Sequence, residues 1–503
     1  MNSEPNIFST LRRFGTVSGA SVFKIPATEI ASGDRRLEAS YYGSSGYQAR
    51  RSIETSGFEM TTIGEVATVL QPPIFKRCFV NNPQFGIPYL NGMELMEVFP
   101  QPDAYLSRSQ TAAIKELVLE RDTVVIPDAG VNAGDSVMFT TSEVEGFATT
   151  NNTIRIKGKT EKWTSEGLFA YLNSTVGNYL LTRTKYGSCI PHIEPRHVEA
   201  IAIPLLPWAL MQELTQMIGR TSAMRRESSQ LLAESQSQLK RSCYLPDIDA
   251  FAKSPSDRSI GSVVTFVESA KARFGNPRGY GETRFDATFH RPLALAIGNH
   301  LLSSKGGTTL GRLVFGVRNS SLRKRIYVDD ESQGVPLIGG KQLIQWRPVG
   351  VNYLSRLLTR NLESEKVHRG WTLVSCGGTL GRCQFVHRNF EGWVMSQDVM
   401  RIIPDPSRVF PGFIYAFLAS PYGQAQIMQR GYGSVIPRLR EFQFDSIAIR
   451  VPDDKGEAID AIITTAFDLR AKAREAEDQA ISLLEEAITR GRSYVEAEWG
   501  TEY

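Results

Sequence analysis

The chain carries the same succession of motifs twice, and this duplication constrains its fold more than any other feature of the sequence. Six short stretches recur in one order at an offset of 246 to 248 residues. Because chance matches would not keep both order and spacing, the 503 residues are expected to form two copies of one fold. The matched stretches are residues 36–42 (RLEASYY) with 284–290 (RFDATFH), 86–92 (GIPYLNG) with 334–340 (GVPLIGG), 145–147 with 391–393, 172–177 with 418–423, 186–191 (YGSCIP) with 432–437 (YGSVIP), and 201–203 with 447–449.

Each repeat mixes strand and helix signals. Short β-branched runs bounded by Gly and Pro predict strands, and examples are residues 122–126 (DTVVI), 152–156 (NTIRI) and 371–375 (WTLVS). Helical patterns follow at 167–181 and 412–430, and each leads through a Tyr-Gly-Ser turn to a strand ending at Pro204 or Pro452. The sequence therefore predicts an α+β protein with two tandem mixed domains.

After its last strand, each repeat loses Gly and Pro and becomes helical in period for about thirty residues. The predicted seams of these two helices consist of residues spaced three and four, or seven, apart: Leu210, Met217, Met224 and Leu231 in the first, and Ile459, Ile462, Ala466, Leu469, Ala473, Ala476, Ala480 and Leu483 in the second. Thr221, Ser228 and Ser235 are polar companions that weaken the first seam. We expect an antiparallel coiled coil, and two surface helices covering their own domains are the alternative.

The length exceeds what one small core requires, so several domains are expected. The predicted boundaries are an N-terminal segment 1–35, a first globular domain 36–207, a first long helix 208–243, a linker 244–283, a second globular domain 284–455, a second long helix 456–490 and a tail 491–503. No stretch of about 18 apolar residues suggests a membrane span, and no signal peptide is evident. Five scattered cysteines are typical of reduced thiols, so a cytoplasmic protein is expected.

Signatures of catalysis are missing from the sequence. Residues 377–382 (GGTLGR) lack the Lys and hydroxyl of a phosphate-binding loop, and 82–85 (NPQF) lack the second proline of a base methyltransferase tetrapeptide. Residues 404–405 (PD) with 453–455 (DDK) fit a metal-dependent nuclease only remotely, and no Cys or His set has zinc spacing. We expect no catalytic or metal-binding residue and no cofactor in this chain. A fused nuclease or methyltransferase with an unrecognised site stays an alternative.

Charge is distributed unevenly between the repeats. Residues 311–390 hold 13 Lys and Arg against 5 Asp and Glu, whereas residues 64–144 hold 5 against 10. A basic surface with interleaved aromatic residues suits phosphates and base edges, although an ordinary solvated surface is the alternative. The candidate DNA-binding residues are Lys76, Arg77, Lys157, Lys159, Lys162, Arg183, Lys185 and Ser188 in the first repeat, and Lys341, Arg347, Arg356, Arg360, Arg369, Thr379, Arg382, Gln397, Ser434, Arg438 and Arg440 in the second.

Taken together, these motifs resemble the specificity (S) subunit of type I restriction-modification enzymes. The resemblance covers about residues 36–490 and rests on 36–42, 284–289, 374–382 (VSCGGTLGR), 396–398 (SQD), the two Tyr-Gly-Ser turns and the helical tails. It implies two target-recognition domains that each read half of a bipartite double-stranded DNA target, with the helices fixing the gap. It also implies partners: methyltransferase subunits that bind S-adenosylmethionine, and a restriction and translocase subunit. No chemistry is then expected of this chain itself.

The first repeat departs from this pattern. It has residues 127–135 (PDAGVNAGD) where the second repeat has its Gly-Thr-Leu-Gly-Arg loop, and Asp128 and Asp135 would repel phosphate. Two other functions stay open. The chain could be the recognition subunit of another anti-phage defence assembly, or a coiled-coil scaffold that never binds DNA.

Overall fold

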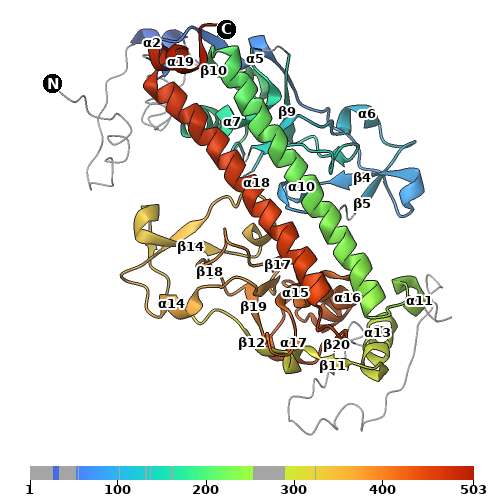
Figure 1. Cartoon of the computed structure of the whole chain (residues 1–503). Helices are drawn as coiled ribbons and strands as arrows, with labels where there is room; N and C mark the ends of the chain where they lie inside the picture. The colour runs from blue at the N-terminus through green and yellow to red at the C-terminus, as the bar shows by residue number, and fades with distance from the viewer. Residues whose placement is uncertain are drawn as a thin grey trace. The chain divides into compact units, whose positions relative to one another are not determined.

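The computed structural model describes most of the chain (Figure 1). The described residues are 27–32, 53–54, 56–100, 102, 104–130, 133–135, 137–159, 162–187, 189–252, 289, 291–322 and 324–502. The motifs 36–42 and 284–288, and the candidate Ser188, lie outside them. Within this part of the chain, no helix is both long and apolar enough to cross a membrane.

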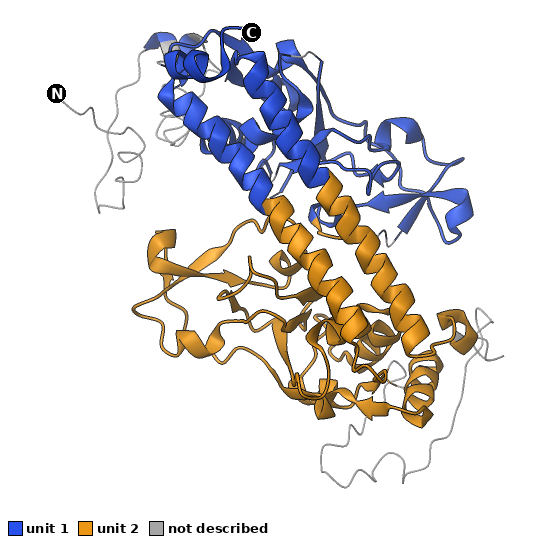
Figure 2. Cartoon of the chain, viewed as in Figure 1, with its two compact units in different colours: residues 1–96, 100–222, 475–503 blue, residues 97–99, 223–474 orange. Residues whose placement is uncertain are grey.

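The chain divides into two compact units (Figure 2). Unit 1 comprises residues 1–96, 100–222 and 475–503, and unit 2 comprises residues 97–99 and 223–474. Each unit therefore contains the globular part of one repeat together with a stretch of each long helix.

Unit 1 contains two four-stranded sheets and a two-stranded one. Their strand orders are β2-β9-β6-β7, β3-β5-β4-β8 and β1-β10. The strands are β1 Met60–Thr62, β2 Ala67–Leu70, β3 Phe79–Val80, β4 Gly86–Leu90, β5 Ala104–Ser107, β6 Val124–Pro127, β7 Met138–Phe139, β8 Ala148–Thr149, β9 Thr153–Gly158 and β10 Ala202–Pro204.

Unit 2 repeats this topology strand for strand, with the orders β12-β19-β16-β17, β13-β15-β14-β18 and β11-β20. The register repeats as well, because Gly86 pairs with Ser107 in unit 1 as Gly334 pairs with Ser355 in unit 2. The predicted duplication is thus confirmed. The strands are β11 Gly307–Thr309, β12 Val314–Arg318, β13 Tyr327–Val328, β14 Gly334–Ile338, β15 Asn352–Ser355, β16 Thr372–Ser375, β17 Cys383–Phe385, β18 Val394–Met395, β19 Val399–Pro404 and β20 Ala448–Arg450.

A pair of consecutive helices occupies the same place in each repeat: α7 Ser165–Asn173 and α8 Thr175–Thr182 in unit 1, and α15 Pro411–Ala419 and α16 Pro421–Arg430 in unit 2. The serine between the helices caps the second one, since the Ser174 side chain accepts a hydrogen bond from Gly177 N and the Ser420 side chain from Gly423 N. A Cβ on Gly177 would lie 1.9 Å from the carbonyl oxygen of Tyr171. The serine-to-glycine spacing seen in both repeats is therefore required by this junction.

The remaining short helices connect these elements. The α-helices are α2 Ala27–Ser32, α5 Ile63–Val66, α6 Ile114–Leu117, α9 Pro195–Glu199, α11 Ile248–Ala252, α13 Pro292–Ser303, α14 Leu362–Glu365, α17 Glu441–Asp445 and α19 Arg492–Trp499. The 3-10 helices are η1 Pro83–Phe85, η2 Glu94–Met96, η4 Leu310–Arg312, η5 Glu331–Gln333 and η6 Gln342–Ile344. Helix α19 forms where only a tail was predicted, and Trp499 Nε1 donates to Glu213 Oε2 over 2.9 Å.

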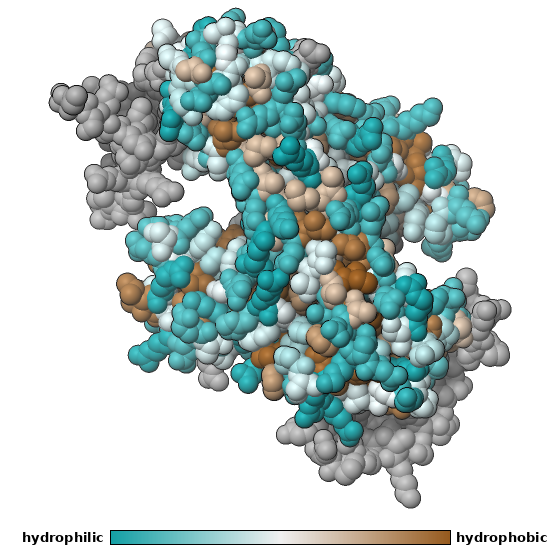
Figure 3. Space-filling model, viewed as in Figure 1, coloured by the Kyte–Doolittle hydropathy of each residue, from teal (hydrophilic) through white to brown (hydrophobic). Residues whose placement is uncertain are grey.

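Two long helices are present, α10 Trp208–Ser242 and α18 Glu457–Arg490, close to the predicted spans. They contribute to the core of each unit. In unit 1 the core includes Leu214 and Ile218 of α10 and Leu484 and Ile488 of α18. In unit 2 it includes Leu232 and Leu239 of α10 and Ile459, Ile463 and Phe467 of α18. In the view of Figure 3, the surface over these helices carries both hydrophilic and hydrophobic residues.

The buried seam of α18 differs in register from the prediction. Ile459, Ala466, Ala473 and Ala480 are fully buried, as expected. Ile462, Leu469, Ala476 and Leu483 are only half-buried, and the residue following each of them is buried instead: Ile463, Arg470, Glu477 and Leu484. Neither Arg470 nor Glu477 belongs to the predicted seam. The structure places both inside.

The buried row of α10 also differs from the predicted seam, because it includes polar residues. Leu210 is buried, but Met217, Met224 and Leu231 are half-buried, and the buried row comprises Met211, Leu214, Ile218, Thr221, Ser228, Leu232, Ser235 and Leu239. The small polar residues tolerate burial because their hydroxyls find partners. Thr221 Oγ1 donates to Ile218 O over 2.7 Å, and Ser235 Oγ donates to Leu232 O over 2.7 Å. Ser228 Oγ accepts from Arg470 Nε over 2.7 Å.

Arg470 also contacts two residues of the short first-repeat segment 97–99 that belongs to unit 2. Its Nη1 donates to Val98 O over 3.2 Å, and its guanidinium carbon lies 3.3 Å from the centre of the Phe99 ring. Glu97 forms an antiparallel bridge with Gln345, its matched residue in the second repeat. Unit 2 is thus completed by a short segment of the first repeat.

Candidate nucleic-acid interface

In unit 2, four loop segments that carry many of the predicted DNA-binding residues meet at the end of strand β16. We call them the unit 2 loop cluster: residues 339–341, 376–381, 396–398 and 432–438. Cys376 N donates to Asp398 O over 2.7 Å, and Gly378 N donates to Pro437 O over 3.0 Å. A Cβ built on Gly340 would lie 3.7 Å from Asp398 O. These contacts bring segments far apart in sequence to one place.

The glycine-rich part of this cluster is a tight turn. Gly378 and Gly381 have φ values of 77° and 80°, the left-handed region that favours glycine. Ser375 Oγ closes the turn, because it donates to Thr379 O over 2.6 Å and accepts from Arg382 N over 2.9 Å. Turn geometry therefore accounts for these two glycines, while Thr379 is left exposed at the tip.

Six of the predicted residues lie on or directly beside the unit 2 loop cluster: Lys341, Thr379, Gln397, Ser434, Arg438 and Arg440. Lys341 is exposed, and Arg438 Nη1 lies 3.6 Å from Asp398 Oδ1. Arg440 is held in place, since its Nε donates to Tyr432 Oη over 2.9 Å and its guanidinium lies 5.2 Å from that ring. The result is an exposed group of cations and hydroxyls on rigid loops.

Other predicted residues of the second repeat have different surroundings. Arg369 pairs with Asp468 of α18 at 2.9 Å, and Arg382 is partly buried with its Nη1 3.3 Å from Glu97 Oε2. Exposed Arg356 and Arg360 follow β15, and partly buried Arg347 follows η6. Arg382 directly follows the cluster segment 376–381, but its side chain pairs with Glu97, and the other four residues lie outside the cluster segments.

Arg325 belongs to the basic region and Asp398 to the motif 396–398, but neither was named from the sequence as a candidate DNA-binding residue. Arg325 Nη2 donates to Gln397 Oε1 over 3.1 Å, and Asp398 faces Arg438. Both contacts join residues that are distant in sequence, so no local pattern could have identified them.

Unit 1 contains a matching cluster built on the same backbone. We call it the unit 1 loop cluster: residues 127–130, 133–134, 150–152, 186–187 and 189–192. Gly130 N donates to Pro191 O over 3.0 Å, as Gly378 N does to Pro437 O. Ile193 N donates to Asp128 O over 2.8 Å, as Leu439 N does to Cys376 O over 2.9 Å. The scaffold is repeated, although its side chains are not.

Carboxylates replace cations in the unit 1 loop cluster. Asp128 is 4% exposed and accepts a hydrogen bond from Gln71 Nε2, and burial raises its pKa to about 6. Lys185 pairs with Asp135, and Tyr186 Oη donates to Glu194 Oε1 over 2.6 Å. Asp128 therefore lies in the unit 1 loop cluster, Asp135 and Glu194 lie beside it, and Glu194 takes the position that Arg440 has in unit 2.

The other candidates of the first repeat separate into two groups. Exposed Arg77 reaches this cluster, because its Nη2 lies 3.4 Å from Thr150 Oγ1, and Lys76 precedes it. Lys157 on β9 pairs with Glu120, while Lys159 and Lys162 are exposed after the end of β9, and Arg183 is partly buried at the end of α8. Among the charged candidates, Arg77 therefore contacts Thr150 of the unit 1 loop cluster, and Lys185 pairs with Asp135, which follows the cluster segment 133–134.

Two matched arginines are buried inside the two repeats. Arg155 donates to the carbonyl oxygens of Glu116, Leu117 and Val118 over 2.7 to 2.8 Å, and burial lowers its pKa to about 10. Arg401 in unit 2 lies 2.9 Å from Glu365 Oε2, and both side chains are about 5% exposed or less. These two arginines are structural, because neither can reach a ligand on the surface.

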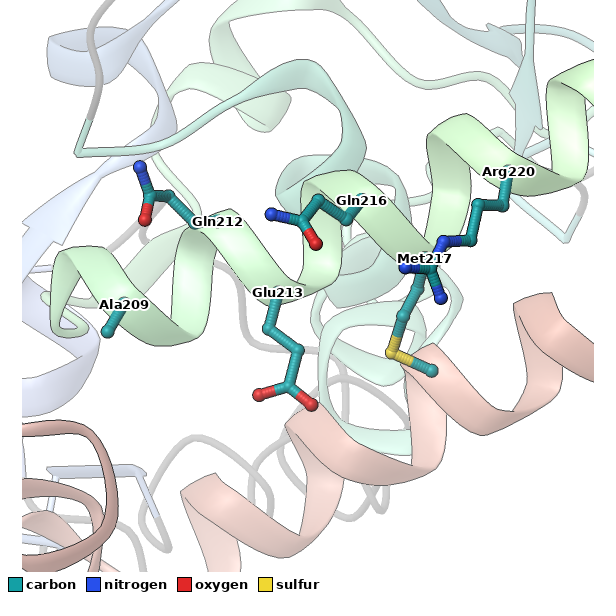
Figure 4. Close-up of a pocket in the computed structure, with 6 residues that line it drawn as sticks. All are labelled: Ala209, Gln212, Glu213, Gln216, Met217 and Arg220. Atoms are coloured by element: carbon teal, nitrogen blue, oxygen red, sulfur yellow. The ribbon is translucent and has the colours of Figure 1, made fainter.

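One further hollow lies on unit 1, along an exposed face of α10 (Figure 4). It has a volume of about 350 Å³ and is lined by Ala209, Gln212, Glu213, Gln216, Met217 and Arg220. These residues follow a single helix face, so the hollow lacks the enclosure of a substrate site. Among the described residues, no group of three or more His, Cys, Asp or Glu side chains could hold a metal ion.

Comparisons with known proteins place the chain near one group of solved structures. It is similar to the type I restriction-modification S subunit from M. genitalium, with 13% identity and a TM-score of 0.30 over 86% of this chain and 96% of that one. It is also similar to the HsdS subunit from Thermoanaerobacter tengcongensis, with 14% identity and a TM-score of 0.26 over 86% and 97%. A third similar chain comes from a structure on complex assembly and conformational transition of the type I R-M system. Its sequence identity is 14% and its TM-score 0.26, over 86% of this chain and 96% of that one.

No family model matches the sequence, and no curated protein matches it. With identities and TM-scores this low, the function must be inferred from the geometry of the two loop clusters.

Proposed function

We propose that the chain is a non-catalytic subunit that recognises a bipartite double-stranded DNA sequence and directs partner subunits to it. The observation that carries this proposal is the repetition of one loop cluster, once in each unit, on the same backbone but with different side chains. Two readers of this kind suit two half-sites of different sequence. A protein with a single catalytic site would not need a second copy of the cluster.

The side chains of unit 2 fit the backbone and base edges of DNA. Exposed Lys341, Arg438 and Arg440 can neutralise phosphates, and Ser434 and Gln397 can bond to base edges in a groove. In unit 1, carboxylates such as Glu194 can accept hydrogen bonds from the amino group of cytosine. The charge difference between the units therefore supports two different specificities.

The two long helices are assigned the role of a spacer. We propose that α10 and α18 pair as an antiparallel coiled coil between the two target-recognition domains and fix the distance between half-sites. The start of α10 and the end of α18 share the core of unit 1, and the opposite stretches share the core of unit 2, which supports this pairing. Two weak half-site contacts on a rigid spacer add up to one strong and spacing-sensitive contact.

The partners are proposed from the resemblance to the specificity subunits of type I restriction-modification enzymes. They are methyltransferase subunits that bind S-adenosylmethionine, and a restriction and translocase subunit, in the cytoplasm. The domain boundaries drawn from the sequence, and the absence of a cofactor in this chain, stay predictions.

The test is a methylome of the source cell with and without this gene, followed by binding of the full chain to the motif it reveals. Loss of one split methylation motif, with salt-dependent binding of that motif by the purified chain, is the expected result. An unchanged methylome with DNA binding retained would point to another defence assembly. If the chain bound no DNA at any salt concentration, the coiled-coil scaffold would be the remaining function.

A further inference from the structure

One feature is shared by both loop clusters although their charges differ: an apolar tip on the Tyr-Gly-Ser turn. In unit 2 the side chains of Val435 and Ile436 are 89% and 55% exposed. In unit 1 the matched Ile190 is 58% exposed. Isolated exposed apolar residues are common, but here the same position of the same turn is apolar and exposed twice.

The base of the turn beneath each tip is closed by two backbone hydrogen bonds. In unit 2, Tyr432 and Arg438 exchange two backbone hydrogen bonds of 3.0 and 2.7 Å, and in unit 1 Tyr186 and His192 exchange two of 3.0 and 2.8 Å. Gly433 makes the turn possible, because its φ is 99° and an added Cβ would lie 2.7 Å from the carbonyl oxygen of Ile436. The tip is therefore presented in a fixed geometry, which reduces the entropic cost of a contact made there.

The residues next to the tip in unit 2 indicate which kind of ligand it can contact. Next to Val435 and Ile436 lie the exposed hydroxyl of Ser434 and the guanidinium of Arg438. An apolar point flanked by a cation and a hydroxyl is complementary to the major groove. There, phosphates border base edges that include the 5-methyl group of thymine.

We propose that the tips formed by Ile190 and by Val435 with Ile436 enter the major groove and contact thymine methyl groups, one tip in each half-site. This proposal rests on the proposed function and names the chemical group that the two loop clusters share as a ligand. It also accounts for recognition by unit 1, whose acidic loops leave few cations for phosphate contacts. The tips supply base contacts that need no charge.

The experiment uses the full chain, a duplex carrying the methylome-derived target, and binding measured at several salt concentrations. Two variants remove the tips, Val435→Ser with Ile436→Ser in unit 2 and Ile190→Ser in unit 1. Each thymine of each half-site is replaced in turn by uracil, which lacks only the methyl group. Because the altered side chains are exposed, the urea midpoints of the variants should match that of the unaltered chain, which verifies folding.

We expect each variant to lose about 4-fold to 15-fold in affinity, the equivalent of one or two buried methyl groups. The slope of affinity against salt should not change, whereas an Arg438→Gln variant should lower it. A uracil in one half-site should weaken binding of the unaltered chain about 4-fold. The same uracil should cost nothing further in the variant of the unit that reads that half-site.

Several results would overturn the inference while leaving the proposed function intact. They are unaltered binding by both variants, and unaltered binding of every uracil duplex by a chain that still recognises its target. Normal DNA binding with loss of a methyltransferase partner would show that the tip docks protein instead. If the unaltered chain bound no DNA, the proposed function itself would fail.

Discussion

Adjacent identical residues on α18 allow the register of its seam to be tested. Ile463 is fully buried in the core of unit 2, where its Cβ lies only 3.0 Å from the position a Cβ would take on Gly412. Ile462 is half-buried. We expect Ile463→Ala to lower the free energy of unfolding by about 2–5 kcal/mol, because removing a buried isoleucine costs transfer energy and leaves a cavity. The change Ile462→Ala should cost about 1 kcal/mol, given its partial exposure.

Comparing Ile463→Ala with Ile462→Ala removes the energy terms that are the same at both positions. Alanine is the better helix former by a few tenths of a kcal/mol at both positions, so this term does not affect their difference. With a urea slope of about 1–3 kcal/mol per molar, a difference of about 2 kcal/mol separates the two midpoints by about 1 M. Urea titration monitored by far-UV circular dichroism measures this difference, and hydrogen exchange of residues 457–474, the part of α18 in unit 2, compared with residues 475–490, assigns the loss to unit 2.

A second matched pair repeats the test in unit 1. Leu484 is fully buried in the unit 1 core and Leu483 is partly buried against it, so Leu484→Ala should again be the more damaging change. Equal losses within either pair, or a larger loss at Ile462 or Leu483, would refute the register described above. The seam would then follow the spacing that the apolar residues alone suggested.

Three further outcomes are expected from single sites. Arg438→Gln should reduce the dependence of log affinity on log salt by about 0.9 if the side chain contacts one phosphate, which a titration of DNA binding at increasing salt measures. Arg401→Met should cost about 3–5 kcal/mol because it leaves Glu365 buried without its partner, and a second change, Glu365→Gln, should recover part of that loss in urea titrations. Asp128 has a pKa raised to about 6, so its protonation contributes stability that is full below about pH 4 and lost as the pH rises through 6. Asp128→Asn should therefore raise the free energy of unfolding at pH 8 by up to about 3 kcal/mol, and urea midpoints should show no difference below about pH 4.

The sequence predicted the duplicated α+β architecture and the two long helices because these depend on repeated local patterns. Matching motifs identified the repeats, and the loss of Gly and Pro after Pro204 and Pro452 located the helices. The seam registers could not be predicted in the same way. Burial of Arg470 depends on Ser228 and on the carbonyl group of Val98, which is 372 residues away.

The candidate site was predicted in part. Lys341, Gln397 and Arg438 were identified from charge and motif, and the structure brings their segments together. Arg369 and Arg382 were named on the same grounds, but their contacts with Asp468 and Glu97 come from distant segments. Composition identifies a basic region without revealing which of its cations already have a partner in the fold. The apolar residues Ile190 and Ile436 were not named as candidates, because the candidates were chosen among charged and polar side chains.

The sharing of α18 between the two units has a consequence for the order in which the protein can fold. Ala480, Leu484 and Val495 belong to the core of unit 1, yet they are translated after the whole of the second repeat. At 5–20 residues per second, about 250 residues separate the two parts of that core by roughly 10–50 s on the ribosome. During this interval the exposed face of Leu214 and Ile218 has no native partner from α18. The core of unit 1 can be completed only after the last residues of the chain are translated. A ribosome that stalls within the second repeat therefore leaves the cores of both units incomplete.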